Sequence, residues 1–177
     1  HLFFTDSQHV LPGISAIDNS AGSVMGIPRL KMPAAAPSRS TLKLDEAIQW
    51  FLSSRQQQKL FGAGMTAVDL GAAPGGWTWQ LVKRGCMVTA IDNGPLQDTL
   101  MKTGMVEHLK TDAFTYGPAK KVDWLVCDMA ERPLHVSRLI ARWFSNGLCN
   151  NAIFNLKLPM KKRLNTVDEC LGVISQK

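Results

Sequence analysis

An eleven-residue run from Ala67 to Trp77 constrains the fold of this chain more than any other feature. The run reads AVDLGAAPGGW, so a short apolar stretch leads into a glycine-rich turn and then into a helix-forming segment. Glycine lets the backbone turn sharply, and it lets backbone N–H groups approach a ligand at the start of a helix. The run therefore predicts a nucleotide-cofactor site at a strand-to-helix turn.

The glycine spacing indicates which cofactor suits this turn. Dinucleotide sites typically have the pattern G-x-G-x-x-G, whereas Gly71, Gly75 and Gly76 have the spacing G-x-x-x-G-G. An acid, Asp69, stands at the end of the strand, and a carboxylate suits a cationic or hydroxyl-bearing ligand. S-adenosylmethionine, with its sulfonium and amino groups, therefore fits better than a nicotinamide dinucleotide.

Alternating strand and helix patterns surround this turn, which is typical of a parallel sheet covered by helices on both faces. A helix of about three turns is predicted from Thr41, with Ser40 or Thr41 as its N-cap. The further predicted elements are strands at 66–70, 87–91, 106–110, 122–127 and 152–156, and helices at 76–84, 96–103, 133–146 and 166–177. We expect an α/β fold.

The first 40 residues differ from the rest of the chain. Residues 32–40 are rich in Pro and Ala and have no periodicity, which is typical of a linker. We expect a lead-in segment and linker over 1–40, with the stretch His1–Phe4 as a strand remnant, and one domain over 41–177. Because the chain starts with His1 and stops inside a predicted helix, we expect it to be a fragment of a longer protein.

Composition narrows the class of partner. The chain has 20 Lys and Arg against 14 Asp and Glu, a formal charge of +6, which favours a polyanionic partner. Its four cysteines have no C-x-x-C spacing, which argues against a zinc site or a disulfide scaffold and favours a reduced cytoplasmic location. No run of about 18 apolar residues occurs, so we expect no membrane span.

Acids follow the predicted strands at one edge of the sheet. They are Asp69, Asp92, Asp112 and Asp128. Ligands of such sheets bind beyond the carboxyl ends of the strands. Asp92 suits ribose hydroxyls and Asp112 an adenine amino group, and Asp69 could instead stabilise the turn. Any one of these acids alone is more typical of a solvated loop or a helix N-cap.

Two lysines and one of these acids are candidates for chemistry. They are Lys43, Asp128 and Lys157. Lys157 ends an otherwise apolar strand, where desolvation and a neighbouring cation favour the neutral amine that a general base requires. The alternative is a lysine that extends into solvent at a strand end.

Six segments together resemble a known family. They are Met25–Lys31, Ala36–Leu44, Val68–Trp77, Asp92–Pro95, Val126–Met129 and Ile153–Arg163. On these segments the chain resembles the FtsJ-like family of Rossmann methyltransferases, and within it the bacterial enzymes that methylate ribose 2′-oxygens of 23S ribosomal RNA. The resemblance implies a Rossmann-like, S-adenosylmethionine-dependent methyltransferase fold whose last strands lie beyond residue 177, preceded by an RNA-binding domain.

The same resemblance implies a reaction and a set of site residues. The reaction is methylation of a cytidine 2′-oxygen, with Lys43, Asp128 and Lys157 as three members of a Lys-Asp-Lys-Glu tetrad and Lys157 as the general base. The Glu has no counterpart here, because in the family it lies further along the chain. The implied cofactor contacts are Ser40, Ala73, Pro74, Gly75, Gly76, Asp92, Asp112 and Asp128.

Other interpretations stay open at this point. The chain could be a non-catalytic module that binds S-adenosylmethionine or RNA, a methyltransferase for a different RNA, or a nicotinamide-dependent oxidoreductase. Lys161, Lys162 and Arg163 are candidate phosphate contacts, although such charge runs are more often solvated. We expect Trp77, Trp79, Trp124 and Trp143 to be core residues, and we expect a monomer without metal, DNA or membrane partners.

Overall fold

The computed structural model describes residues 1–20, 22–23 and 26–175, which belong to two compact units, 1–31 and 32–177. In the first unit β1 (Leu2–Phe4) and β2 (Val10–Pro12) form an antiparallel hairpin, followed by the 3-10 turn η1 (Ile17–Asn19). The expected strand at the start of the chain is thus present as β1. Met25, part of one family-like segment, lies outside the described residues.

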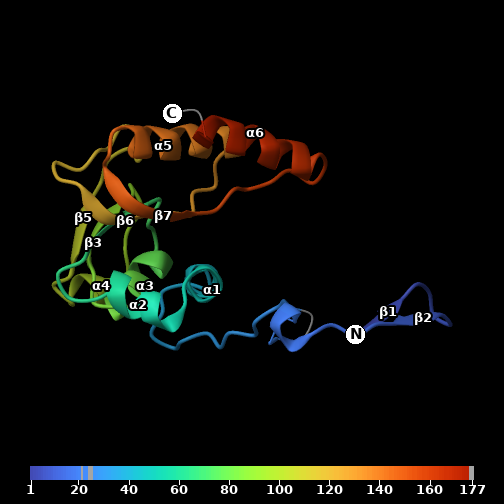
Figure 1. The fold of residues 1–177 in the computed structure, drawn as a ribbon. Helices are drawn as coiled ribbons and strands as arrows, with labels where there is room; N and C mark the ends of the chain where they lie inside the picture. The colour runs from blue at the N-terminus through green and yellow to red at the C-terminus, as the bar shows by residue number, and fades with distance from the viewer. Residues whose placement is uncertain (21, 24–25, 176–177) are drawn as a thin grey trace. The chain divides into compact units, whose positions relative to one another are not determined.

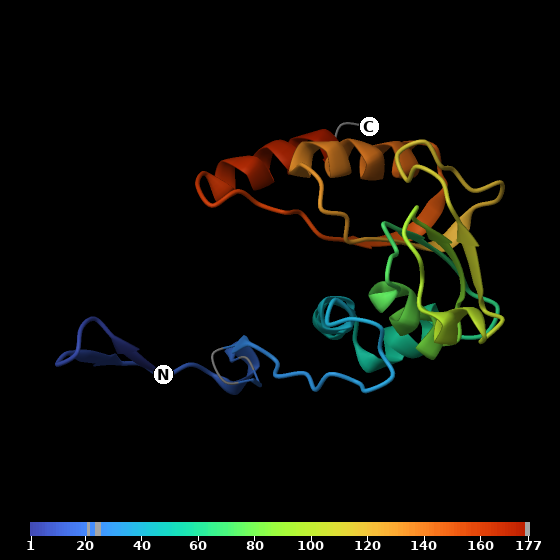
Figure 2. The same ribbon diagram turned by 180° about the vertical axis from the view of Figure 1, so that it is seen from behind.

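The second unit contains a five-stranded, fully parallel sheet (Figures 1 and 2). Its strands are β3 (Thr66–Leu70), β4 (Met87–Ile91), β5 (Val106–Leu109), β6 (Val122–Cys127) and β7 (Cys149–Phe154). The spatial order is β5-β4-β3-β6-β7. The chain therefore adds β4 and β5 on one side of β3 and then β6 and β7 on the other, and the switch point lies between β3 and β6. In such sheets the crevice beyond the carboxyl ends at this switch point is where ligands bind.

Helices cover both faces of the sheet. They are α1 (Thr41–Phe51), α2 (Ser54–Leu60), α3 (Gly76–Lys83), α4 (Asp98–Met101), α5 (Pro133–Ser145) and α6 (Arg163–Ser175). Figure 1 shows α5 and α6 on one side of the sheet and α1 and α3 on the other. The expected α/β architecture is confirmed.

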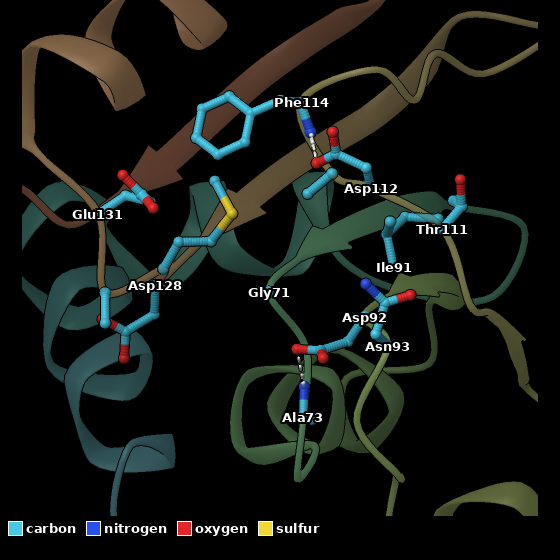
Figure 3. A pocket seen from close by; sticks show the side chains of 13 residues that line it. Gly71, Ala73, Ile91, Asp92, Asn93, Thr111, Asp112, Phe114, Asp128 and Glu131 are labelled. Carbon is cyan, nitrogen blue, oxygen red and sulfur yellow. Dashed lines mark hydrogen bonds between the residues drawn. The ribbon is translucent and has the colours of Figure 1, made fainter.

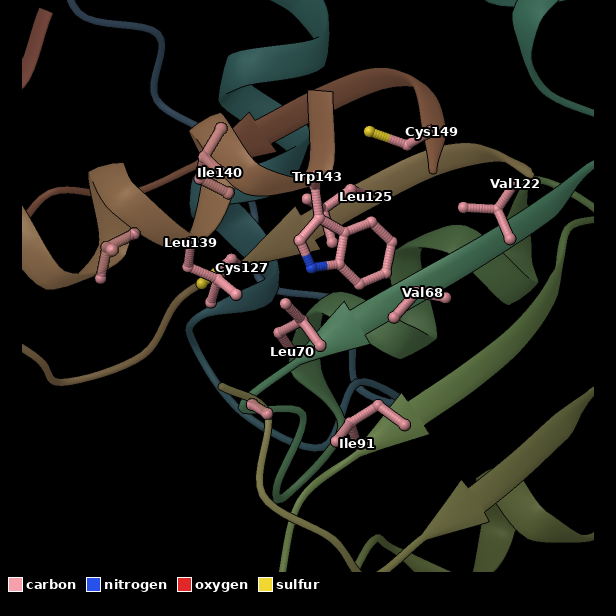
Figure 4. Close-up of a cluster of buried hydrophobic side chains, with 12 residues drawn as sticks. Val68, Leu70, Ile91, Val122, Leu125, Cys127, Leu139, Ile140, Trp143 and Cys149 are labelled. Atoms are coloured by element: carbon pink, nitrogen blue, oxygen red, sulfur yellow. The ribbon is translucent and has the colours of Figure 1, made fainter. Parts of the chain in front are cut away.

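The strands contribute side chains to both faces in alternation, as the pleat of a strand requires. Leu125 and Cys127 of β6 pack in the cluster that includes α5, around the fully buried Trp143 (Figure 4). Trp124 and Val126 of the same strand pack in the cluster that includes α1 and α3. Because both faces are covered, the strands are almost continuously apolar.

The structure agrees with most predicted elements and corrects several bounds. β3, β4 and β6 have the predicted ranges, whereas β7 lies at Cys149–Phe154 rather than at 152–156. α6 begins at Arg163, before the predicted start, and residues 176–177 of that prediction lie outside the described residues.

The sequence analysis missed α2. Its sequence, SRQQQKL, lacks an apolar period, and a capping box stabilises its start instead. In that box the Ser53 hydroxyl accepts from the Gln56 backbone N–H, and the Gln56 side chain accepts from the backbone N–H of Ser53.

One tryptophan prediction was wrong. Trp77, Trp124 and Trp143 are buried, but Trp79 is half-buried, with the Lys83 ammonium 5.2 Å from its ring centroid. Trp79 lies two positions after Trp77 and therefore on another side of α3. Within the described ranges, every helix is too short or too polar to cross a lipid bilayer.

Candidate active site

The glycine turn after β3 is packed too closely for larger residues. Gly75 is the N-cap of α3 and has a left-handed backbone (φ 112°), and a Cβ there would collide with the buried side chain of Leu100. A Cβ on Gly76 would collide with the hydroxyl oxygens of Ser38 and Ser40. Glycine is therefore required at Gly75 because of its backbone conformation and because no space is left for a side chain. At Gly76 it is required because of the space alone.

The carboxylate of Asp92 links this turn to the loop after β4. Its Oδ2 accepts from the backbone N–H of Ala73 at 2.9 Å (Figure 3), and its Oδ1 accepts from that of Gly94 at 2.7 Å. The imidazole Nε2 of His108 on β5 lies 2.8 Å from the carbonyl oxygen of Asp92. Asp92 is thus fixed at its side chain and at its backbone, and each carboxylate oxygen keeps a lone pair for a ligand.

A cavity of about 410 Å³ lies beyond the ends of β3, β4 and β6. Three of the predicted acids line it, Asp92, Asp112 and Asp128, together with Ala73 from the glycine turn (Figure 3). Its apolar wall includes Phe114 and Met129. Cavities of this size with a few convergent polar groups are typical of small-molecule sites.

The fourth predicted acid, Asp69, does not belong to this edge. Its side chain is buried, and its Oδ2 accepts from the Thr78 hydroxyl of α3 at 2.7 Å. Burial raises the pKa of Asp69 to about 7, although the hydrogen bonds from Thr78 partly oppose this rise. The expectation of four acids at one edge was wrong for Asp69, because strand alternation turns its side chain toward α3.

Lys43, Asp128 and Lys157 come together at the side of the cavity. The Nζ of Lys43 donates to Asp128 Oδ2 at 2.9 Å, and the Nζ of Lys157 donates to Asp128 Oδ1. Lys43 comes from α1, Asp128 directly follows β6, and Lys157 lies in the segment after β7. The structure therefore brings together three residues that are far apart in the sequence.

Asp128 is the shared acceptor of this cluster. Its side chain is only 11% exposed, whereas those of Lys43 and Lys157 are 50% and 35% exposed. Burial acts to raise the pKa of Asp128, but hydrogen bonds from Lys157, Asn155 and Lys43 outweigh it, so the pKa is lowered. Asp128 is thus held as a carboxylate between two cations.

The remaining predicted cofactor residues lie near the cavity without lining it. Pro74, Gly75 and Gly76 form the turn itself, and Ser40 lies beneath it. Ser40 is at the N-cap of α1, but its hydroxyl bonds to that of Ser38 at 2.6 Å instead of capping the helix. Its carbonyl oxygen accepts from Trp77 Nε1 at 2.9 Å, which ties α1 to α3.

Several site residues were not predicted. Asn155 Nδ2 donates to Asp128 Oδ1 at 2.9 Å, and the cavity is also lined by Asn93, Thr111, Phe114, Met129 and Glu131. Asn93, Met129 and Asn155 all stand within two residues of a strand end. A search of every position just after each strand would have found them, because that edge of the sheet forms the crevice.

Two further cavities flank the lysines. One, of about 590 Å³, is lined by Lys157, the start of α5 and α6. The other, of about 410 Å³, is lined by Lys43, Asn155 and the exposed aromatic residues Trp50 and Phe51. Asp128, which lines the first cavity, is therefore hydrogen-bonded to one lysine from each of the two flanking cavities.

Comparison with known proteins decides the family of this chain. A sequence model of the FtsJ-like methyltransferase family matches residues 36–168, which is most of the chain. The chain belongs to this family. It is 55% identical over its whole length to the ribosomal RNA large subunit methyltransferase M of Azoarcus sp. (strain BH72) and 57% identical to that of Thauera aminoaromatica. It covers 49% of each relative, so it spans about half their length.

A solved structure supports the fold. A Plasmodium falciparum protein described as a ribosomal RNA methyltransferase aligns with a TM-score of 0.53 at 16% identity, over 76% of this chain and 85% of that one. At this identity the likeness concerns the fold alone. Together with the sheet order, it confirms the expected Rossmann-like methyltransferase fold of this FtsJ-like chain.

Proposed function

We propose that this FtsJ-like chain is the S-adenosylmethionine-binding catalytic part of an enzyme that methylates a ribose 2′-oxygen, on a cytidine of 23S ribosomal RNA. The observation that carries the proposal is the pair of lysines held by Asp128 at the wall of the cavity. The shared acid places a candidate base, Lys157, beside the cavity that suits the methyl donor. The names and identities of the Azoarcus and Thauera relatives support the choice of ribosomal RNA.

The cavity fits S-adenosylmethionine in the chemistry of its lining. Asp92, with one free lone pair on each oxygen, would accept from the two ribose hydroxyls, and Asp112 would accept from the adenine amine. Phe114 and Met129 offer apolar contacts for the adenine ring. When bound, this cofactor supplies an electrophilic methyl carbon.

Lys157 would remove the proton from the ribose 2′-hydroxyl. To accept a proton the amine must be neutral. The carboxylate of Asp128 holds this amine in position by a hydrogen bond, and the same carboxylate accepts from Lys43. The protein otherwise works by holding the two partners in position.

The charge of the chain supports an RNA substrate. The formal charge is +6, and the exposed residues Lys161, Lys162 and Arg163 begin four positions after Lys157. Phosphate contacts by such residues give affinity that falls with salt concentration. We propose them as contacts to the RNA backbone, in an enzyme that works in the cytoplasm.

The test is transfer of a labelled methyl group from S-adenosylmethionine to unmodified 23S ribosomal RNA. This chain is assayed, and nuclease digestion then locates the label on ribose or base. We expect the label on the 2′-oxygen of one cytidine, with the Lys157→Ala variant of the same protein as the control. Cofactor binding without transfer to any RNA would instead indicate a binding module.

A further inference from the structure

The cavity on the Lys157 side adjoins the cofactor cavity directly. Ala130 and Glu131 line both of them, so the two cavities share a wall. Lys157 lines the second cavity, while its hydrogen-bond partner Asp128 lines the first. A 2′-hydroxyl that reaches Lys157 therefore lies where the two cavities meet.

A nucleotide with its 2′-oxygen at this point needs a place for its base. The base is attached to the sugar carbon next to the one that carries the 2′-oxygen, so it must lie within one sugar ring of Lys157. We propose that the second cavity, of about 590 Å³, binds the base of the acceptor nucleotide and that Glu169 selects an amino-bearing pyrimidine. This inference rests on the proposed ribose methylation.

The walls of this cavity suit a flat aromatic ring. Pro133 and Leu134 at the start of α5 line this cavity together with Pro159 of the loop after β7. Apolar walls with a few polar groups are the usual form of a site for an aromatic ligand, because ring burial contributes affinity and the polar groups contribute selectivity. The polar groups here include the carboxylates of Glu131 and Glu169.

The two carboxylates differ in their hydrogen-bond partners within the protein. Glu131 Oε2 accepts from the Arg132 backbone N–H at 3.2 Å and lies 3.6 Å from His135 Nδ1. Glu169 on α6 is exposed and has no hydrogen bond or ion pair among the residues that the structure describes. An ionised carboxylate only accepts, so it attracts the 4-amino group of cytosine and repels the 4-oxygen of uracil.

The loop that forms one wall has a defined shape. Lys162 has a left-handed backbone (φ 57°), and its carbonyl oxygen accepts from both the N–H and the hydroxyl of Thr166 at 3.1 Å. Arg163 Nε donates to the carbonyl oxygen of Pro159 at 3.3 Å. A non-glycine residue in this conformation is strained, and such residues cluster at ligand sites.

The third cavity is the competing place for the base. It offers Trp50 and Phe51, which are 57% and 72% exposed, beside Lys43. It shares no lining residue with the cofactor cavity among the described residues, whereas the second cavity shares two. Continuity with the cofactor cavity therefore favours the second cavity.

The first experiment compares CMP and UMP, which differ at position 4 of the base. Saturation-transfer NMR is recorded on each nucleotide at millimolar concentration. An excess of S-adenosylhomocysteine is present, so that the cofactor cavity is filled. We expect the base protons of CMP to receive roughly threefold or more of the saturation that those of UMP receive, because only cytosine donates to the carboxylate. Equal signals, or none, would overturn the proposal.

Variants then test Glu169 itself. In Glu169→Gln the amide both donates and accepts, so the ratio of CMP to UMP signals should fall to about one. Asp168→Asn is the matched control, because Asp168 is an exposed neighbour on α6 that does not line the cavity. The ratio should stay at the wild-type value in this control, and an equal fall in both variants would contradict a specific contact.

Photocrosslinking locates the bound base in the structure. An RNA oligonucleotide with 5-iodocytidine is irradiated with the chain, and we expect labelled peptides that contain Leu134 or Pro159. Label on Trp50 or Phe51 would place the base in the third cavity and overturn the proposal. Base binding without methyl transfer would support the base site and contradict the proposed reaction. Methyl transfer without a preference for cytosine would support the reaction and contradict the base site.

Discussion

The proposed active site has two halves, a cofactor side and an acceptor side, which are held in place by different kinds of interaction. On the cofactor side, the backbone shapes the site. Gly75, with a left-handed backbone, is the N-cap of α3, and the N–H groups of Ala73 and Gly94 donate to the carboxylate of Asp92. On the acceptor side, long charged side chains meet at Asp128 and remain partly exposed. The first half depends on close packing, and the second depends on charge.

Because of this difference, mutations in the two halves should have different effects. A change in the glycine turn should affect folding and cofactor binding together, because the same atoms serve both. A change among the lysines should affect the reaction with little effect on stability, since exposed ion pairs contribute about 1 kcal/mol or less. The following predictions test this contrast, beginning with the largest expected effect.

Lys157→Ala should remove methyl transfer while leaving the cofactor site intact. We expect the rate to fall by roughly 100-fold to 10,000-fold, the usual contribution of a general base. Calorimetric titration with S-adenosylhomocysteine should give nearly the wild-type affinity, because Lys157 does not line the cofactor cavity. Loss of cofactor affinity in this variant would contradict the separation of the two halves.

Gly75→Ala should destabilise the fold. The left-handed backbone alone costs an alanine roughly 1–2 kcal/mol, and the collision with Leu100 adds roughly 1–3 kcal/mol of overpacking. Gly104→Ala is the control, because Gly104 also has a positive φ (68°) but no atom lies within 4 Å of a Cβ built there. Urea unfolding of both variants measures the difference, and equal losses would show that packing against Leu100 adds nothing.

Asp69→Asn should change how stability depends on pH. The pKa of Asp69 is raised from 3.8 to about 7, so between these values the folded state keeps a proton that the unfolded state releases. The stability contributed by Asp69 is therefore fully present below 3.8 and is lost as the pH rises through about 7.

The asparagine variant should not show this loss. Relative to it, the wild-type free energy of unfolding should fall by up to about 1.4 kcal/mol per pH unit across that range. Denaturant unfolding at several pH values measures the slope, with Asp98→Asn, an exposed acid of α4, as the control. Parallel curves for wild type and Asp69→Asn would show that burial does not hold the proton.

Lys43→Met should have the smallest effect on stability. Its side chain is 50% exposed, so we expect a loss of less than about 1 kcal/mol in the free energy of unfolding at pH 7. Arg84→Met is the comparison, because the Arg84–Asp45 pair is only 18% and 22% exposed and should cost more. A larger loss for Lys43→Met than for Arg84→Met would mean that the acceptor side also supports the fold.

Much of the fold could be read from local patterns. The strands β3, β4 and β6 are short apolar runs between turn residues, and their ranges follow directly from those runs. The missed helix α2 has no apolar period, and the early start of β7 lies in polar residues, Asn150 and Asn151. The periodicity of apolar residues indicates which side chains are buried. It therefore does not reveal an element that is stabilised by capping or by hydrogen bonds within the sheet.

The sequence by itself determined the glycine turn, the alternation of strands and helices after it, the family and the identity of the residues at the strand ends. These are local properties, since backbone freedom, hydrophobic period and motif spacing are set by near neighbours in the chain. The family resemblance grouped Lys43, Asp128 and Lys157, but only the tertiary structure showed the contacts of the residues at the strand ends. It gave the hydrogen bond that links Lys43 to Asp128 across 85 positions, added Asn155, and turned Asp69 toward Thr78 and away from the cavity. Such choices depend on the pleat of each strand and on the elements that pack beside it, and neither is a property of a residue and its immediate neighbours.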